Sequence, residues 1–167
     1  VEAIEKAGVV ELDAFREEFV ITDIVSYVDE ETGSEILVMP SKEYQITTMV
    51  DFGTKVLGTQ NATLNKISDF KKNISDSRTF SFLHEIEMLL EHGLIKGGDL
   101  NNAIVYVDKE LSDETMLKLK KAFNKEKLSV QSNGILDNLK LHYPNEAARH
   151  KLLDVIGDLA LVGTRIR

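Results

Sequence analysis

The residues best suited to chemistry are His150 and Asp154, which lie four positions apart in the segment 149–154. In a helix, residues at i and i+4 lie one turn apart on one face, so the imidazole and the carboxylate can share a cation such as Zn²⁺. A catalytic zinc site takes three protein ligands and leaves a position for water, so a third ligand must come from elsewhere. By spacing alone, an ordinary ion pair along a helix explains the two residues better.

A second candidate is the hydroxyl of Thr79, in the segment 77–80 just ahead of an expected helix. A hydroxyl and exposed backbone N–H groups at such a position can stabilise an anion. Simple N-capping by Ser77 or Thr79 is the more economical interpretation of the same pattern. His84 and His92 fall eight positions apart in the following helix and are expected to face solvent.

Composition limits the classes of protein and of site that are possible. The chain has 167 residues, of which 43% are hydrophobic, enough for the core of one domain. Its net charge of −8 opposes a nucleic-acid partner. It contains no cysteine, so a metal site must use histidine and carboxylate ligands. No run of about 18 apolar residues predicts a transmembrane segment, and no signal peptide is recognisable, so we expect a cytoplasmic protein.

Alternating segments of strand and helix character must position these candidates. Residues rich in β-branched and aromatic types predict strands at 18–28, 35–40, 44–52, 62–66 and 103–107. Apolar residues at helical spacing, together with capping residues, predict helices at 68–73, 82–92, 112–123 and 144–162. Asn133-Gly134 is typical of a hairpin turn. These elements predict an α+β fold, a two-layer α/β sandwich in which a mixed or antiparallel sheet packs on two principal helices.

Several short motifs stand in one order along the chain. They are Ser77-Arg78-Thr79-Phe80, Ile86-Glu87, Gly93-Leu94-Ile95-Lys96-Gly97-Gly98, Asn102-Ala103-Ile104-Val105, Arg149-His150-Lys151-Leu152-Leu153-Asp154 and Ile156-Gly157-Asp158-Leu159. This order resembles the second domain of the zinc-dependent UDP-3-O-acyl-N-acetylglucosamine deacetylases of lipid A synthesis, especially their Bacteroidetes-type members. The match covers most of residues 18–163. The resemblance implies an amidohydrolase that uses Zn²⁺ to remove the N-acetyl group from UDP-3-O-acyl-N-acetylglucosamine.

The resemblance also implies a role for each matching residue. His150 and Asp154 correspond to the two zinc ligands of this domain. Thr79 corresponds to the hydroxyl that helps to stabilise the oxyanion of the tetrahedral intermediate. Asp158 corresponds to the carboxylate that orients a catalytic histidine beyond residue 167.

Substrate contacts follow from the same resemblance. Lys151 is expected to reach the sugar-nucleotide region, and Phe80 and Phe52 are expected to form walls for the glucosamine and uridine parts. A hydrophobic passage for the acyl chain is expected from Phe82, Leu83, Ile86, Ile95, Leu100, Ala103 and Val105. These apolar residues would serve equally well as plain core.

The resemblance divides the chain into three parts. We expect residues 1–16 to be the tail of a missing first domain and its linker, 17–163 to be the second deacetylase domain, and 164–167 to be a truncated end. The family's third zinc ligand and its general-base Glu belong to the first domain, so the fragment itself is expected to be inactive. A fused dehydratase domain is a further possible partner. The alternatives are a non-catalytic domain that binds the acyl chain and the UDP-sugar, and a structural domain with a fortuitous His–Asp pair.

Overall fold

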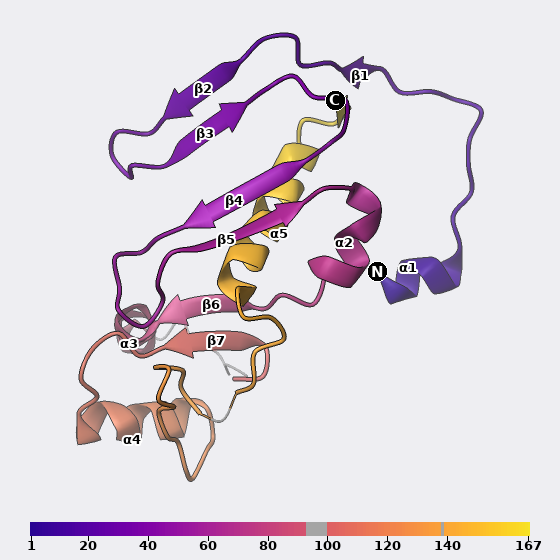
Figure 1. Cartoon of the computed structure of the whole chain (residues 1–167). Helices are drawn as coiled ribbons and strands as arrows, with labels where there is room; N and C mark the ends of the chain where they lie inside the picture. Colours follow the sequence, from indigo (N-terminus) through magenta and orange to yellow (C-terminus); the bar gives the residue numbers. More distant parts are fainter. Residues whose placement is uncertain (93–99, 138) are drawn as a thin grey trace. The chain divides into compact units, whose positions relative to one another are not determined.

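The structure, a computed structural model, describes residues 1–92, 100–137 and 139–167. Its helices are α1 (Glu2–Ala7), α2 (Phe70–Asn73), α3 (Leu83–Glu91), α4 (Asp113–Ala122) and α5 (Glu146–Ala160), with a 3₁₀ turn η1 (Ile67–Asp69) before α2 (Figure 1). Its strands are β1 (Glu18–Phe19), β2 (Val25–Val28), β3 (Glu35–Val38), β4 (Ile46–Val50), β5 (Gln60–Leu64), β6 (Thr79–Phe82), β7 (Ala103–Tyr106) and β8 (Arg165–Ile166). The mixture of helices and small sheets confirms the α+β class.

The chain forms two compact units. Unit 1 comprises residues 1–47, 63–75 and 152–167, and unit 2 comprises residues 48–62 and 76–151. The division passes through β4, β5 and α5. Most of the candidate site residues belong to unit 2.

The sheets in the described residues are two-stranded and of both kinds. β2 and β3 are antiparallel, whereas β1 pairs with β8, and β6 with β7, in parallel. β4 pairs with β5. The strand expected at 18–28 is interrupted by a bend at Asp23, whose carboxylate accepts a hydrogen bond of 2.8 Å from the Thr22 hydroxyl. Parallel and antiparallel pairs therefore both occur, in separate two-stranded sheets.

In unit 2, strand β6 was not expected from the sequence, although its residues Thr79-Phe80-Ser81-Phe82 have strand character. Figure 1 shows β6 and β7 as neighbouring arrows that point the same way. Pairing begins with Thr79 opposite Ala103 and ends with Phe82 opposite Tyr106. Because β6 leads directly into α3, Ser77 precedes a strand and Thr79 begins it, so neither residue lies at the start of a helix.

The N-cap expected from Ser77 or Thr79 is therefore wrong. The carboxylate of Glu85 supplies the cap of α3 by accepting hydrogen bonds from the Phe82 backbone N–H at 2.8 Å and from the Ser81 hydroxyl at 2.7 Å. At α4 the prediction of a Ser112 cap is confirmed, since its hydroxyl oxygen accepts the N–H of Thr115 at 3.1 Å.

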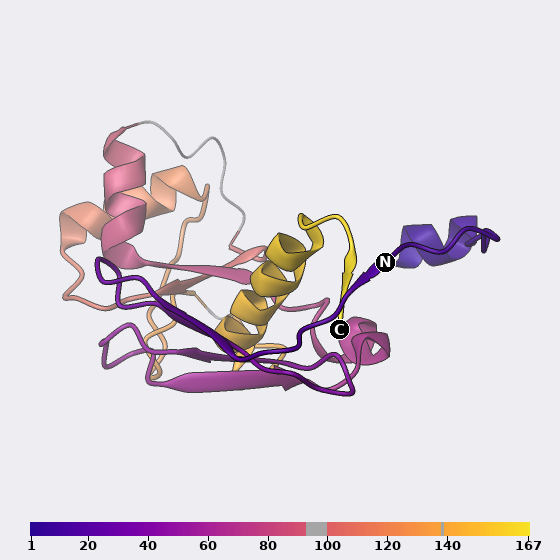
Figure 2. The same ribbon diagram turned by 90° about the horizontal axis from the view of Figure 1, so that it is seen from above.

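Two hydrophobic clusters form the core of unit 2. One combines Phe82 of β6, Ile104 and Tyr106 of β7 and Ala147 of α5 with Leu57 and Ile135, which lie in connecting segments. The other lies between α3 and α4, two helices that Figure 2 shows near one another. Its buried residues are Leu83, Ile86, Leu100, Val105, Leu119 and Leu136. The chain turns at Asn133-Gly134 as predicted: Val130 and Leu136 form an antiparallel bridge, and the backbone N–H of Asp137 donates to the carbonyl of Ser129 at 2.6 Å.

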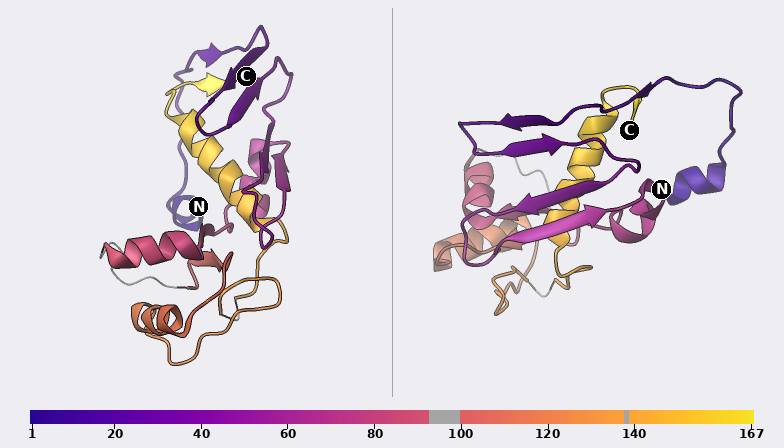
Figure 3. Two further views of the ribbon diagram at one scale, coloured as in Figure 1. Left: turned by 90° about the vertical axis from the view of Figure 1, so that its left-hand side faces the viewer. Right: turned by 45° about the horizontal axis from the view of Figure 1, so that its top comes forward.

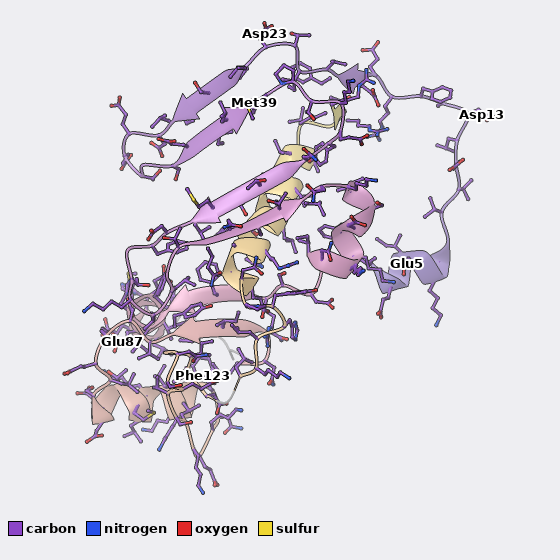
Figure 4. The ribbon with its side chains drawn as sticks, viewed as in Figure 1. Glu5, Asp13, Asp23, Met39, Glu87 and Phe123 are labelled. Carbon is purple, nitrogen blue, oxygen red and sulfur yellow. The ribbon has the colours of Figure 1, made fainter. Side chains whose placement is uncertain are left out.

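Unit 1 contains ion pairs between residues that lie far apart in the sequence. Glu5 on α1, labelled in Figure 4, forms an ion pair with Lys71 on α2. β8 lies beside β1 in the left panel of Figure 3. The carboxylate of Glu18 pairs with Arg165 at 3.3 Å and with Arg167 at 3.2 Å. None of the helices in the described parts of the chain is long and apolar enough to cross a lipid bilayer.

Candidate metal and substrate site

The side chain of His150, on α5, is held by the backbone ahead of β6. Its Nδ1 lies 3.2 Å from the carbonyl oxygen of Ser77. A carbonyl oxygen can only accept a hydrogen bond, so Nδ1 carries the proton. In the neutral imidazole the lone pair then resides on Nε2, which is the nitrogen able to coordinate a metal. Metal-binding histidines commonly donate their other N–H to such a carbonyl, so His150 fits a ligand role.

A buried ion pair anchors the first turn of α5 to the same backbone segment. The carboxylate of Glu146, whose side chain is fully buried, accepts hydrogen bonds from the Arg78 guanidinium at 2.8 and 3.1 Å. It also accepts the backbone N–H groups of Arg78 at 3.0 Å and of His142 at 2.7 Å. The guanidinium makes a further hydrogen bond of 2.9 Å to the carbonyl oxygen of Lys140.

These contacts set the charge state of Glu146. Burial by itself raises the pKa of the carboxyl group, but the hydrogen bonds from Arg78 and His142 outweigh it and hold the pKa below its ordinary value of 4.5. The group is therefore a carboxylate at neutral pH. The sequence gives no local signal of this pair, because the arginine and the glutamate lie 68 positions apart.

Asp154 and Asp158 follow His150 on α5 at intervals of four residues. The helical repeat puts the three side chains along one side of this helix. In the parts of the chain that the structure describes, no group of three or more His, Asp or Glu side chains is arranged to hold a metal ion. The assignment of His150 and Asp154 as metal ligands therefore stays a prediction.

Thr79 opens β6, two residues after Ser77, and is exposed. The next residue, Phe80, is half-buried, and the ammonium Nζ of Lys151 lies 5.8 Å from the centre of its ring. Such a cation–π contact contributes about 0.5–1 kcal/mol when exposed. The sequence-predicted residues Phe80 and Lys151 are thus brought together in unit 2.

Further aromatic rings pack beside that of Phe80. The ring of Phe52, which is 42% exposed, lies edge-on to those of Phe80 and Phe82, each at 5.4 Å between centres. His84 stacks on Phe82 at 5.8 Å, and its Nδ1 lies 2.6 Å from a carboxylate oxygen of Asp108. His84 is exposed, as expected, but its contacts with Phe82 and Asp108 were not foreseen.

The family model described as UDP-3-O-acyl N-acetylglycosamine deacetylase matches residues 1–129 and 119–167, which together span the chain. The chain belongs to this deacetylase family. Family membership confirms the resemblance drawn from the ordered motifs.

Three members of the deacetylase family illustrate the similarity. Proteins named bifunctional enzyme LpxC/FabZ from Bacteroides thetaiotaomicron and Porphyromonas gingivalis are each 41% identical over 167 residues, 100% of this chain and 36% of the relative. The UDP-3-O-acyl-N-acetylglucosamine deacetylase of Myxococcus xanthus is 35% identical over 161 residues, 96% of this chain and 43% of the relative. The chain therefore spans well under half the length of these relatives.

The described residues expected to line an acyl passage in the deacetylase family lie on β6, α3 and β7, except Leu100, which precedes β7. Leu83, Ile86, Leu100 and Val105 belong to the cluster between α3 and α4, and Phe82 belongs to the neighbouring cluster. Ala103 is half-buried at the start of β7. Ile95 lies outside the described residues. The passage stays a prediction.

Proposed function

We propose that this chain is part of a zinc-dependent deacetylase that removes the N-acetyl group from UDP-3-O-acyl-N-acetylglucosamine during lipid A synthesis. One observation carries the proposal: the deacetylase family model matches the whole length of the chain. The tautomer of His150 adds support from the structure, because it puts a lone pair on Nε2.

In this proposal His150 and Asp154 hold the zinc ion together with a histidine from a first domain outside residues 17–163. When bound, Zn²⁺ supplies polarisation of the amide carbonyl and a lowered pKa of water. The general-base Glu belongs to the same first domain. Asp158 orients a further histidine beyond residue 167.

The chain's own side chains bind and orient the substrate. The Thr79 hydroxyl donates a hydrogen bond to the oxyanion as charge develops there. The Lys151 ammonium, placed over the Phe80 ring, meets the negatively charged diphosphate region, while Phe80 and Phe52 give the sugar and the base apolar surfaces. Residues of β6, α3 and β7 accommodate the acyl chain.

Metal content of the intact protein tests this assignment. His150→Ala or Asp154→Ala should remove the zinc and abolish turnover. His84→Ala is the matched control, since His84 lies on α3, where its Nδ1 contacts a carboxylate oxygen of Asp108. That variant should keep one zinc per chain. Full zinc occupancy and turnover in either α5 variant would reject the assignment.

A second proposal concerns residues 1–167 acting alone, as a non-catalytic domain that binds the acyl chain and part of the UDP-sugar. The exposed ring of Phe52 beside Phe80 and Lys151 favours such binding. Titration with UDP should then show saturable binding to these residues alone, without deacetylation. Deacetylation by them that a chelator abolishes would exclude this reading.

The relatives named LpxC/FabZ suggest a fused second enzyme. We propose that the complete polypeptide is of this bifunctional kind, with a hydroxyacyl-carrier-protein dehydratase module, and acts in the cytoplasm. The intact protein should then dehydrate a 3-hydroxyacyl carrier protein as well as deacetylate the UDP-sugar. A complete polypeptide with deacetylase activity alone would contradict the fusion.

A further inference from the structure

We propose that the peptide group joining Ser77 to Arg78, held in place by Glu146, is a positioning device that selects the metal-binding tautomer of His150. The inference rests on the proposed function, in which His150 is a zinc ligand. It assigns Arg78 and Glu146 a task beyond stability: they orient the carbonyl that determines which nitrogen of the imidazole carries the proton.

Both polar atoms of this one peptide group contact α5. Its N–H, contributed by Arg78, donates to Oε1 of Glu146 at 3.0 Å. Its carbonyl, contributed by Ser77, accepts from Nδ1 of His150 at 3.2 Å. Glu146 and His150 are i and i+4 on the helix, so the peptide spans one helical turn. Because a peptide group is planar and rigid, fixing its N–H also fixes the direction of its carbonyl.

The carboxylate that holds this peptide is itself restrained. Glu146 is completely buried and accepts four hydrogen bonds, three of them from Arg78 and one from the backbone of His142. Hydrogen bonds to a buried charge are among the strongest in proteins. Arg78 is tethered in turn to the carbonyl of Lys140. The peptide therefore has little freedom to rotate.

The consequence for His150 is chemical. With the Ser77 carbonyl directed at Nδ1, the neutral imidazole is held as the Nδ1–H tautomer, and Nε2 is the ligand atom. If the peptide rotates, this preference is lost and the population with a proton on Nε2 rises. Outer hydrogen-bond partners of metal-binding histidines typically change metal affinity by about 10–100-fold.

The ¹⁵N resonances of His150 in the intact, metal-free protein test the inference, with His150→Ala used to assign them. We expect the wild type to show a protonated Nδ1 at a pH where the ring is neutral. Glu146→Gln, which removes the charge and leaves a single acceptor oxygen, should shift the ring toward a mixture of tautomers. The same variant should raise the dissociation constant for zinc by about 10–100-fold.

Asp137→Asn is the matched control, because it breaks a different ion pair of unit 2, that with Lys125 at 2.9 Å. It should change neither the tautomer nor the zinc affinity. A Glu146→Gln protein that melts earlier but keeps the wild-type tautomer and zinc affinity would show a purely structural role and overturn the inference.

The wild-type spectrum decides the matter if Glu146→Gln does not fold. A proton on Nε2 in the neutral ring of the wild type would overturn the inference without any variant. If the proposed function is wrong, the result is a different one. His150→Ala would then keep its zinc, while the tautomer of His150 in the metal-free wild type would still depend on Glu146.

Discussion

The carbonyl oxygen of Ser77 lies 3.2 Å from Nδ1 of His150, although 73 positions separate the two residues in the sequence. This contact joins the backbone just ahead of Thr79 to the helix that carries the predicted metal ligands. It therefore brings two parts of the candidate site into one arrangement within unit 2. A change in the backbone position of Ser77 and Arg78 should accordingly alter the contacts of α5.

Thr79→Ala should distinguish stabilisation of the oxyanion from binding of the metal in the proposed site. The hydroxyl should act on the oxyanion and not on the metal, so zinc stoichiometry in the intact protein should stay at one. Loss of one oxyanion donor typically lowers kcat by about 10²–10³-fold. Steady-state kinetics beside metal analysis would check this, with Thr79→Ser expected to recover most of the rate. Loss of zinc in Thr79→Ala would contradict the separation.

Glu146 should make the stability of the protein depend on acid pH. Its pKa in the folded state lies below the ordinary value of 4.5, so its contribution is complete above that value. The contribution is lost as the pH falls through the folded-state pKa. Urea unfolding of residues 1–167 between pH 7 and pH 3 should show this decline.

Glu146→Gln should flatten that part of the pH profile. At pH 7 it leaves the guanidinium of Arg78, whose side chain is only 12% exposed, without its counter-charge. Removal of one partner of a buried ion pair costs about 3–5 kcal/mol. A variant that matches the wild type in both stability and pH slope would show that the pair is not closed in solution.

Phe52 and Phe82 touch each other but should respond differently to truncation. Phe52 is 42% exposed, so Phe52→Ala should lower the free energy of unfolding by about 1 kcal/mol while weakening UDP binding by about 10-fold. Phe82 is 5% exposed, so Phe82→Ala should cost about 3–5 kcal/mol of stability. Calorimetric titration with UDP and chemical denaturation would measure both. Unchanged UDP affinity in Phe52→Ala would remove Phe52 from the proposed site.

Gly134 and Gly163 form a matched pair, since each has a φ of 79°. A Cβ at Gly163 would meet no atom within 4 Å, so Gly163→Ala reports backbone strain alone, about 1–2 kcal/mol. A Cβ at Gly134 would lie 2.6 Å from Cγ1 and 2.9 Å from Cβ of Val56. Gly134→Ala should therefore lose about 1–3 kcal/mol more. Equal losses in denaturation experiments would show that Val56 moves aside freely.

The sequence by itself determined the features that depend on residues close to one another along the chain. Helical spacing placed His150, Asp154 and Asp158 on one helix, and a serine ahead of an acidic turn predicted the Ser112 cap that the structure contains. The ordered motifs identified the family, because several short patterns in one order are rarely coincidental. These inferences need only the local geometry of a helix or a turn.

The sequence was less reliable where two local solutions compete. Residues 77–82 offered both hydroxyl caps and aromatic strand formers, and the strand prevailed because β7 provides a partner for each residue from Thr79 to Phe82. The cap of α3 then moved to Glu85. Tertiary pairing thus overrode a local preference of comparable strength.

Only the tertiary structure decided which distant groups meet. The Arg78–Glu146 pair, the Ser77–His150 hydrogen bond and the His84–Asp108 pair join residues 68, 73 and 24 positions apart. Spacing along a chain specifies geometry over a few residues, whereas contacts of this kind depend on how strands and helices pack. The sequence therefore supplied the predicted ligands of the site, and the fold supplied the carbonyl that contacts His150 and the buried charges beside it.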